Sequence, residues 1–205
     1  MTDSGTLLAT AIITGVLGPI LVIAAKYYFD KRKGKSDMVT EALLTSERVS
    51  NKLDHIKQEF HADRVWVAQF HNGGHFYPTG KSIAKFSIVY EIVGTGALSV
   101  QSNFQNIPVS LFSKPINHLL EHNVIEIPDY KDETIATYGL KYVADEAETK
   151  STYMFAIKTM EDRFIGALCV DYTKRKTRLT PDDITQLLNQ ATAIGGVLNV
   201  QLHSK

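Results

Sequence analysis

The chain has 205 residues, with 22 basic and 22 acidic side chains, so its formal net charge is zero. A balanced charge gives no overall field that favours nucleic acid, and no nucleic-acid partner is expected. The single cysteine, Cys169, excludes an internal disulfide framework and is expected to be a small buried residue of a strand.

An apolar run near the N-terminus is the first element. Residues 5–25 read GTLLATAIITGVLGPILVIAA, without a charged side chain between Asp3 and Lys26. Roughly 20 such residues are enough for a helix to cross the ~30 Å hydrocarbon core of a membrane. We therefore expect a transmembrane anchor over residues 1–30. A cleaved signal peptide is the alternative, but it would need a basic start, and MTDSGT carries an acid and no base.

Aromatic and basic residues follow the apolar run and form the expected membrane-interface set: Lys26, Tyr27, Tyr28, Lys31, Arg32, Lys33 and Lys35. Basic residues beside a transmembrane helix stay on the cytoplasmic side and are attracted to anionic lipid. The expected topology is therefore single-pass in the cytoplasmic (inner) membrane of the cell. The N-terminus would lie outside, the remaining domain would lie in the cytoplasm, and the lipid bilayer would be a partner.

Residues 31–62 are predicted to be a basic juxtamembrane segment followed by an amphipathic linker helix from about Ser36 to Ala62. Its small and apolar residues recur at steps of three and four, as in a coiled coil: Val39, Ala42, Ser46, Val49, Leu53, Ile56 and Phe60. Two interpretations remain open. The stripe packs on the following domain, or it mediates self-association into a homo-oligomer.

Residues 63–205 are expected to form one α+β domain. Strands are predicted at 64–70, 84–93, 124–127, 152–159 and 164–172, and helices at 109–123, within 132–147 and from a Thr180 cap to about Leu202. Strands joined by hairpins imply an antiparallel sheet, here of about five or six strands, with flanking helices. In the second strand, alternation predicts one shared face for Phe86, Ile88, Tyr90 and Ile92.

Two stretches near the C-terminal end carry a family resemblance. Residues 164–172 read FIGALCVDY, and residues 178–188 read RLTPDDITQLL. A strand of the form x-x-Gly-x-Leu-x-Val, followed by a Thr/Ser-x-x-Asp/Glu helix start, resembles the closing block of a GAF domain, a sensor module related to PAS. With the opening strand and the preceding helix, the resemblance covers about residues 40–202.

The GAF resemblance implies a ligand between the sheet and the middle segment, about residues 94–149. The Asn-Lys and Asp-Glu signature of the members that bind cyclic nucleotides is not seen. The lone cysteine lies in a predicted strand, which does not suit bilin attachment as in phytochromes. The cofactor is therefore left unknown.

A polar loop after the first strand is the predicted ligand-binding set, together with an acid on the second strand: His71, Asn72, Gly73, Gly74, His75, Tyr77 and Glu91. Paired glycines let the backbone approach a ligand or adopt positive φ. The alternative is a turn whose glycines serve only its geometry, with Glu91 on a solvated strand face.

His118, Glu121 and His122 match the inverted zinc-protease pattern His-x-x-Glu-His. A catalytic zinc needs a third protein ligand, and histidines near a helix C-terminus also complement the helix dipole. We therefore predict no metal, with His118 and His122 as the weak candidates, and no enzyme.

The leading hypothesis is a membrane-anchored cytoplasmic sensory or regulatory module. It would be non-catalytic, act through oligomerisation or an unidentified protein partner, and bind a small-molecule ligand. The first alternative is a structural component of a membrane complex, including one of bacteriophage origin, with a closed pocket. The second is a zinc-dependent hydrolase that uses His118, Glu121 and His122.

Overall fold

The computed structural model describes residues 5, 15, 17–32, 38–75 and 78–203. The chain divides into two compact units, Met1–Glu41 and Ala42–Lys205. The first contains α2 (Gly18–Arg32), and the division falls within α3 (Met38–Glu59). The predicted domain limits at residues 30 and 62 stay a prediction.

The expected membrane anchor lies mostly outside the described residues, because residues 6–14 and 16 are not among them. Within the part that is described, no helix is both long enough and apolar enough to cross a membrane. The anchor therefore remains a prediction, as do the interface roles of Lys33 and Lys35, which also lie outside the described residues.

The larger unit is built on a six-stranded antiparallel sheet with the order β3-β2-β1-β6-β5-β4. Its strands are β1 (Arg64–His75), β2 (Ser82–Val93), β3 (Ile107–Pro108), β4 (Val124–Ile127), β5 (Ser151–Lys158) and β6 (Phe164–Tyr172). The predicted α+β class and antiparallel sheet are confirmed. The two-residue β3 was not predicted, because it is too short to produce an alternating pattern.

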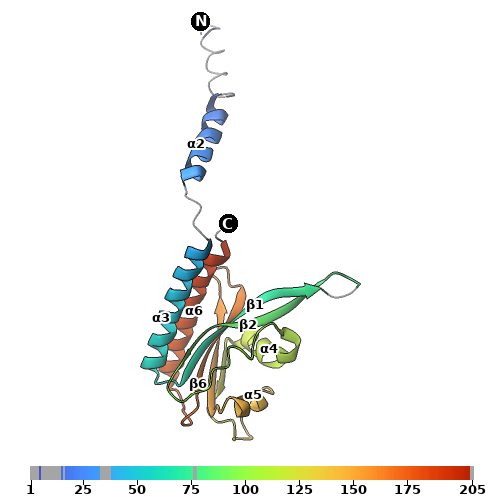
Figure 1. Ribbon diagram of the computed structural model, residues 1–205, viewed down its shortest axis with the longest axis vertical. Helices are drawn as coiled ribbons and strands as arrows, with labels where there is room; N and C mark the ends of the chain where they lie inside the picture. The colour runs from blue at the N-terminus through green and yellow to red at the C-terminus, as the bar shows by residue number, and fades with distance from the viewer. Residues whose placement is uncertain (1–4, 6–14, 16, 33–37, 76–77, 204–205) are drawn as a thin grey trace. The chain divides into compact units, whose positions relative to one another are not determined.

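Two long helices, α3 and α6 (Pro181–His203), lie side by side on one face of the sheet (Figure 1). They bury a core against the strands with Val49, Leu53, Ile56, Leu187, Ala191, Ile194 and Leu198, and Phe60, directly after α3, belongs to the same core. The interpretation that the predicted linker stripe packs on the domain is thus confirmed for its C-terminal half. In its N-terminal half, Val39 is 62 % exposed, and self-association through that part stays a prediction.

The opposite face carries η2 (Val109–Phe112), α4 (Ser113–His122), α5 (Lys141–Glu146) and the loops between them. The predicted helix 109–123 is therefore two elements. Pro115 explains the break, because its ring would clash with the carbonyl of Leu111 in a continuous helix but is tolerated in a first turn. α4 ends at Asn123, whose left-handed backbone places its N–H 2.9 Å from the Leu119 carbonyl oxygen.

A β-bulge changes which side chains of β2 share a face. Val67 pairs with Tyr90, whereas the next residue, Ala68, pairs with Ile88, so Val89 is an extra residue. Extra residues in one strand break the alternation of side chains. Ile88 packs beneath α5 near Trp66, whereas Tyr90 packs against the core of α3 and α6. The prediction of one shared face for Phe86, Ile88, Tyr90 and Ile92 is therefore wrong.

Candidate functional site

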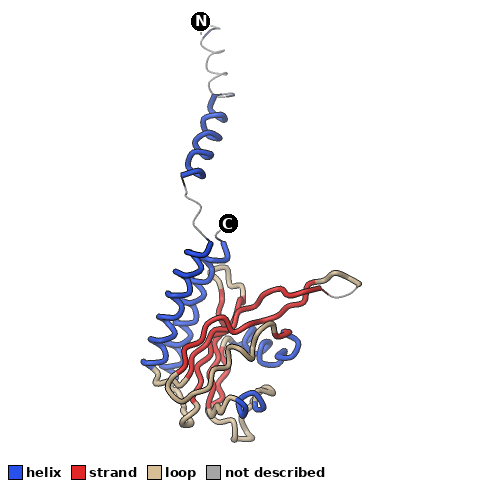
Figure 2. The backbone as a smooth tube through the Cα atoms, in the orientation of Figure 1, coloured by secondary structure: helices blue, strands red, loops and turns tan. Residues whose placement is uncertain are grey.

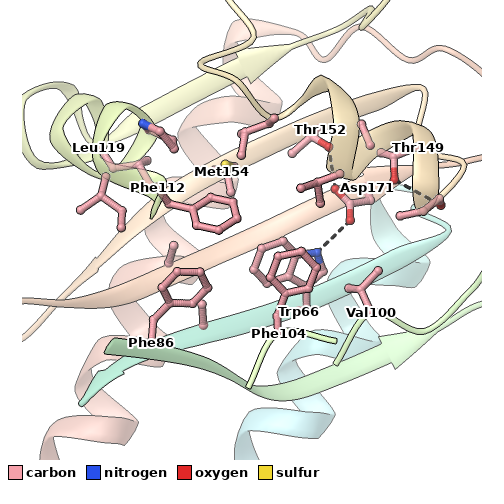
Figure 3. Close-up of a pocket in the computed structure, with 18 of the residues that line it drawn as sticks. Trp66, Phe86, Val100, Phe104, Phe112, Leu119, Thr149, Thr152, Met154 and Asp171 are labelled. Carbon is pink, nitrogen blue, oxygen red and sulfur yellow. Dashed lines mark hydrogen bonds between the residues drawn. The ribbon is translucent and has the colours of Figure 1, made fainter. Parts of the chain in front are cut away.

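A cavity of about 90 Å³ lies between the sheet and the layer formed by α4 and α5. Figure 3 shows its large side chains coming from strands, helices and loops that are distant in sequence. Most of the walls are aromatic or aliphatic: Trp66, Phe70, Phe86, Phe104, Phe112, Leu119 and Met154. This is the region in which the GAF resemblance placed a ligand.

Three phenylalanines shape one end of the cavity. Phe112 from η2 lies edge to face with Phe86 of β2, with ring centroids 5.3 Å apart, and Phe104 makes a similar contact with Phe112 at 6.0 Å. Edge-to-face pairs are favourable arrangements of aromatic rings. These contacts therefore hold the apolar end in a defined shape.

A buried ion pair forms the other end of the cavity. Arg64 and Asp171 are paired residues of β1 and β6, and each is 2 % exposed. The Arg64 Nη2 and Nε atoms lie 2.8 and 2.9 Å from the Asp171 Oδ2 atom. Burying two charges is costly unless they are paired and hydrogen bonded, and this pair meets both conditions.

Neighbouring groups complete the hydrogen bonding of the pair. The Trp66 indole N–H donates to Asp171 Oδ2 at 2.8 Å, and the Thr152 hydroxyl donates to Oδ1 at 2.7 Å (Figure 3). Arg64 donates through Nη1 to the Leu98 carbonyl oxygen at 2.7 Å and through Nη2 to the Thr149 hydroxyl at 2.8 Å. Both charges are therefore satisfied within the protein.

Two further ionisable groups lie beside the pair and stay neutral near pH 7. Burial raises the pKa of the Tyr130 phenol, and Asp171 adds to the increase. Burial also raises the pKa of the Cys169 thiol well above its usual value, again with a contribution from Asp171. Cys169 is fully buried in the core beneath α4 and α5, so it offers no thiolate for covalent attachment.

The predicted binding loop lies elsewhere in the fold. Beyond Gln69, which pairs with Gly166, β1 pairs only with β2, and the two strands extend as a hairpin away from the rest of the sheet (Figure 2). His71 contacts Ser87 there through Nε2 at 2.9 Å. Tyr77 of the predicted set lies outside the described residues. None of the described members of the set lines the cavity: His71, Asn72, Gly73, Gly74, His75 and Glu91. A binding role for this loop stays a prediction.

Glu91 is hydrogen bonded to the loop that follows β2. Its carboxylate accepts hydrogen bonds from the Ser99 hydroxyl and from the backbone N–H groups of Val100 and Gln101, at 2.5, 2.9 and 3.2 Å. Val100 and Phe104 of the same loop line the cavity. Glu91 thus positions a wall of the cavity from outside it.

The two candidate metal ligands lie on α4, where His118 is half-buried and His122 is exposed. The rings of His118 and His122 are 4.4 Å apart, and His118 Nε2 lies 3.3 Å from the Tyr138 hydroxyl. Within residues 38–75 and 78–203, as in the rest of the described chain, no group of three His, Cys, Asp or Glu side chains is placed to hold a metal ion. The geometry gives the predicted zinc pattern no third ligand of these types.

Sequence reasoning missed the residues of the polar end. A usable signal exists, because Arg64 is the charged residue of the apolar run RVWVAQF and Asp171 is the charged residue of FIGALCVDY. Opposite charges within two strands that are otherwise apolar indicate a buried pair if the strands are neighbours. That adjacency was not predicted.

No family model and no curated protein matches the sequence. Solved structures match the three-dimensional structure of the chain. A crystal structure of a far-red cyanobacteriochrome photoreceptor aligns with 90 % of this chain and 99 % of its own, with 15 % identity and a TM-score of 0.60. The GAF domain of PixJ from Thermosynechococcus elongatus, in its blue-light absorbing form, aligns with 80 % of this chain and 89 % of its own, with 14 % identity and a TM-score of 0.61. The far-red absorbing dark state of JSC1_58120g3 with bound biliverdin aligns with 82 % of this chain and 100 % of its own, with 12 % identity and a TM-score of 0.58. The larger unit therefore has the fold of GAF domains.

Proposed function

We propose that this chain is a sensory or regulatory module that binds a small molecule in the cavity beneath α4 and α5, without catalytic activity of its own. The observation that carries the proposal is a cavity of about 90 Å³ with aromatic walls and a satisfied polar end. An apolar pocket with a few convergent polar groups is the usual form of a small-molecule site.

The ligand we propose is smaller than the pigment of a similar structure. Biliverdin is bound in one solved structure of this fold, which supports a ligand role for the corresponding space. A cavity of about 90 Å³ is small for a four-ring pigment, and the buried Cys169 offers no thiolate for attachment. Non-covalent binding of a smaller molecule follows.

The strand β1 offers a route from the cavity to the helices. Arg64 and Trp66 line the cavity, whereas Val65 and Val67 belong to the core beneath α3 and α6. Because alternate residues of a strand face opposite sides of the sheet, a ligand that shifts β1 also changes the packing of α3. We propose that the output passes through α3 to a partner protein or to a second copy of the chain.

We also propose that the N-terminal segment anchors the chain in the cytoplasmic membrane, with the domain on the cytoplasmic side. Leu21, Val22 and Ile23 of α2 are each 68 % exposed, and a basic run follows at residues 31–35. Exposed neighbouring apolar side chains favour burial in lipid or protein.

Thermal denaturation of the full chain with a panel of metabolites tests ligand binding. A ligand at one hundred times its Kd stabilises the protein by about 2.7 kcal/mol, which raises Tm by roughly 5 to 10 °C for a chain of this size. A structural component with a closed pocket predicts no shift with any member of the panel, and that result would contradict the proposal.

Membrane extraction tests the anchor in the full chain. The double variant Leu21→Glu, Ile23→Glu is expected to move most of the protein from the membrane fraction to the soluble fraction, because two charges within an apolar span are costly. Leu111→Glu is the matched control, since Leu111 is 71 % exposed on the GAF-like unit. Equal membrane fractions for all three proteins would contradict the anchor.

A further inference from the structure

We infer that the ligand is an uncharged molecule with a single flat ring and a hydroxyl or amide group, bound with the ring among Phe86, Phe104 and Phe112. This inference rests on the proposed ligand-binding function and names the chemical class of the ligand. Its basis is the charge, the size and the layout of the cavity.

The Arg64–Asp171 ion pair determines which ligand charge the cavity can accept. Among the described residues that line the cavity, only Arg64 and Asp171 are charged, and each is bonded to the other. An anionic ligand would have to draw Arg64 away from Asp171, and a cationic ligand would have to draw Asp171 away from Arg64. Either change leaves a buried charge without its partner, which proteins rarely tolerate. A neutral ligand leaves the pair intact.

Size limits the ligand to about one ring. A water molecule needs about 10–15 Å³ of cavity volume, and an apolar cavity of about 150 Å³ in another protein takes benzene. The cavity of about 90 Å³ thus holds several waters, or a single ring after small movements of its walls. Phe86 and Phe104 each meet Phe112 edge to face, and aromatic side chains of this kind favour contact with a further flat ring.

The polar end of the cavity determines which functional group the ligand carries. Two hydroxyl groups line the cavity there and are already bonded to the ion pair, Thr149 to Arg64 and Thr152 to Asp171. The Thr149 hydroxyl also donates to the Ala147 carbonyl oxygen, and the Thr152 hydroxyl is also hydrogen bonded to Tyr130. A hydroxyl oxygen has one donor and two acceptor sites, so each can accept one more hydrogen bond. A neutral hydroxyl or amide N–H on the ligand can donate to these oxygens without disturbing either charge.

Four small probes of similar shape test the inference in the full chain at pH 7. Benzyl alcohol and benzamide are neutral, whereas benzylamine is cationic and benzoate is anionic. Trp66 is the only tryptophan of the chain, lines the cavity and donates to Asp171, so its fluorescence reports binding at this place. The neutral probes are expected to change the fluorescence and raise Tm, with binding of the charged probes weaker by about a hundredfold or more.

Cavity-filling variants locate the binding. Val143→Phe and Ala144→Leu enlarge side chains that line the cavity, and both are expected to lose the response to the neutral probes. Ala193→Leu is the control, because Ala193 is exposed on α6. Val143 is only half-buried, so its variant keeps the test valid if Ala144→Leu fails to fold.

Two results overturn the inference. One is benzoate or benzylamine binding as tightly as the neutral probes, which leaves the proposed binding function standing with another ligand class. The other is no response to any of the four probes. In that case the metabolite panel decides separately whether the cavity binds a different molecule or whether the proposed function also fails.

Discussion

At the scale of single residues, the buried Arg64–Asp171 pair defines the polar end of the cavity. Removing one partner leaves the other charge buried, so Arg64→Met is expected to lower the free energy of unfolding by about 3–5 kcal/mol. The double variant Arg64→Met, Asp171→Leu removes both charges and should cost much less than the sum of the single variants. Urea unfolding followed by Trp66 fluorescence measures all of them. Additive costs would contradict the coupling.

Asp63 provides a pH-dependent residue outside the cavity. Burial raises the pKa of its carboxyl, but the backbone N–H groups of Lys174 and Thr173 and the Lys174 ammonium outweigh burial and lower the pKa below its ordinary value of 3.8. A lowered folded pKa adds stability that is present above pH 3.8 and is lost as pH falls through the folded pKa.

The variant Asp63→Asn tests the direction of this pH dependence of stability. At pH 7 it is expected to lose about 1.5–3 kcal/mol, the contribution of hydrogen bonds to a charged group. Its unfolding free energy should then fall less steeply than that of the parent protein as the pH is lowered from 7 to 3. Parallel pH profiles measured by urea unfolding would contradict the role of the carboxylate.

At the scale of elements, the features with strong local signals could be predicted. The β5–β6 hairpin consists of two largely apolar runs, each buried over most of its length and joined by a short polar turn. The Thr180 hydroxyl and Asp183 carboxylate cap the start of α6 reciprocally, as their spacing predicts. The β2 bulge and the break before α4 could not be predicted with the same signals. The bulge depends on register with another strand, and the break overrides a pattern of apolar residues.

The site was harder to predict than the elements. The polar run at residues 71–77 was predicted to bind the ligand because its polar residues are adjacent in sequence. Its described members lie in the hairpin and do not line the cavity. The cavity combines β1, the loop before β3, α4 and β6, whose residues are up to about one hundred positions apart, as in the Arg64–Asp171 pair. Local motifs carry no information about such distant contacts, although the resemblance indicated the region in which the cavity lies.

The contact between α6 and β5 allows a matched test of packing. A Cβ atom at Gly195 would lie 2.1 Å from the Lys158 carbonyl oxygen, whereas one at Gly196 would meet nothing within 4 Å. Gly195→Ala is therefore expected to cost about 1–3 kcal/mol, and Gly196→Ala to be neutral or to gain up to about 1 kcal/mol from helix propensity. Chemical denaturation distinguishes them, and equal effects would contradict the close approach.

At the scale of the whole molecule, the sheet separates the helix-packed core from the cavity. One face packs α3 and α6, and α3 leads toward the N-terminal segment, whereas the other face holds the cavity. The same central strand, β1, contributes to both faces. This arrangement suits a module in which occupancy of the cavity is transmitted to a helix and from there to a partner or a membrane.

The central claim is that the cavity holds a small molecule, and native mass spectrometry of the full chain in mild detergent tests it most directly. We expect the protein, mixed with benzyl alcohol or benzamide, to carry one molecule of the probe per chain. The Val143→Phe variant should appear as the bare chain under the same conditions. Bare chain in both samples, or equal occupancy in both, would contradict a ligand site beneath α4 and α5.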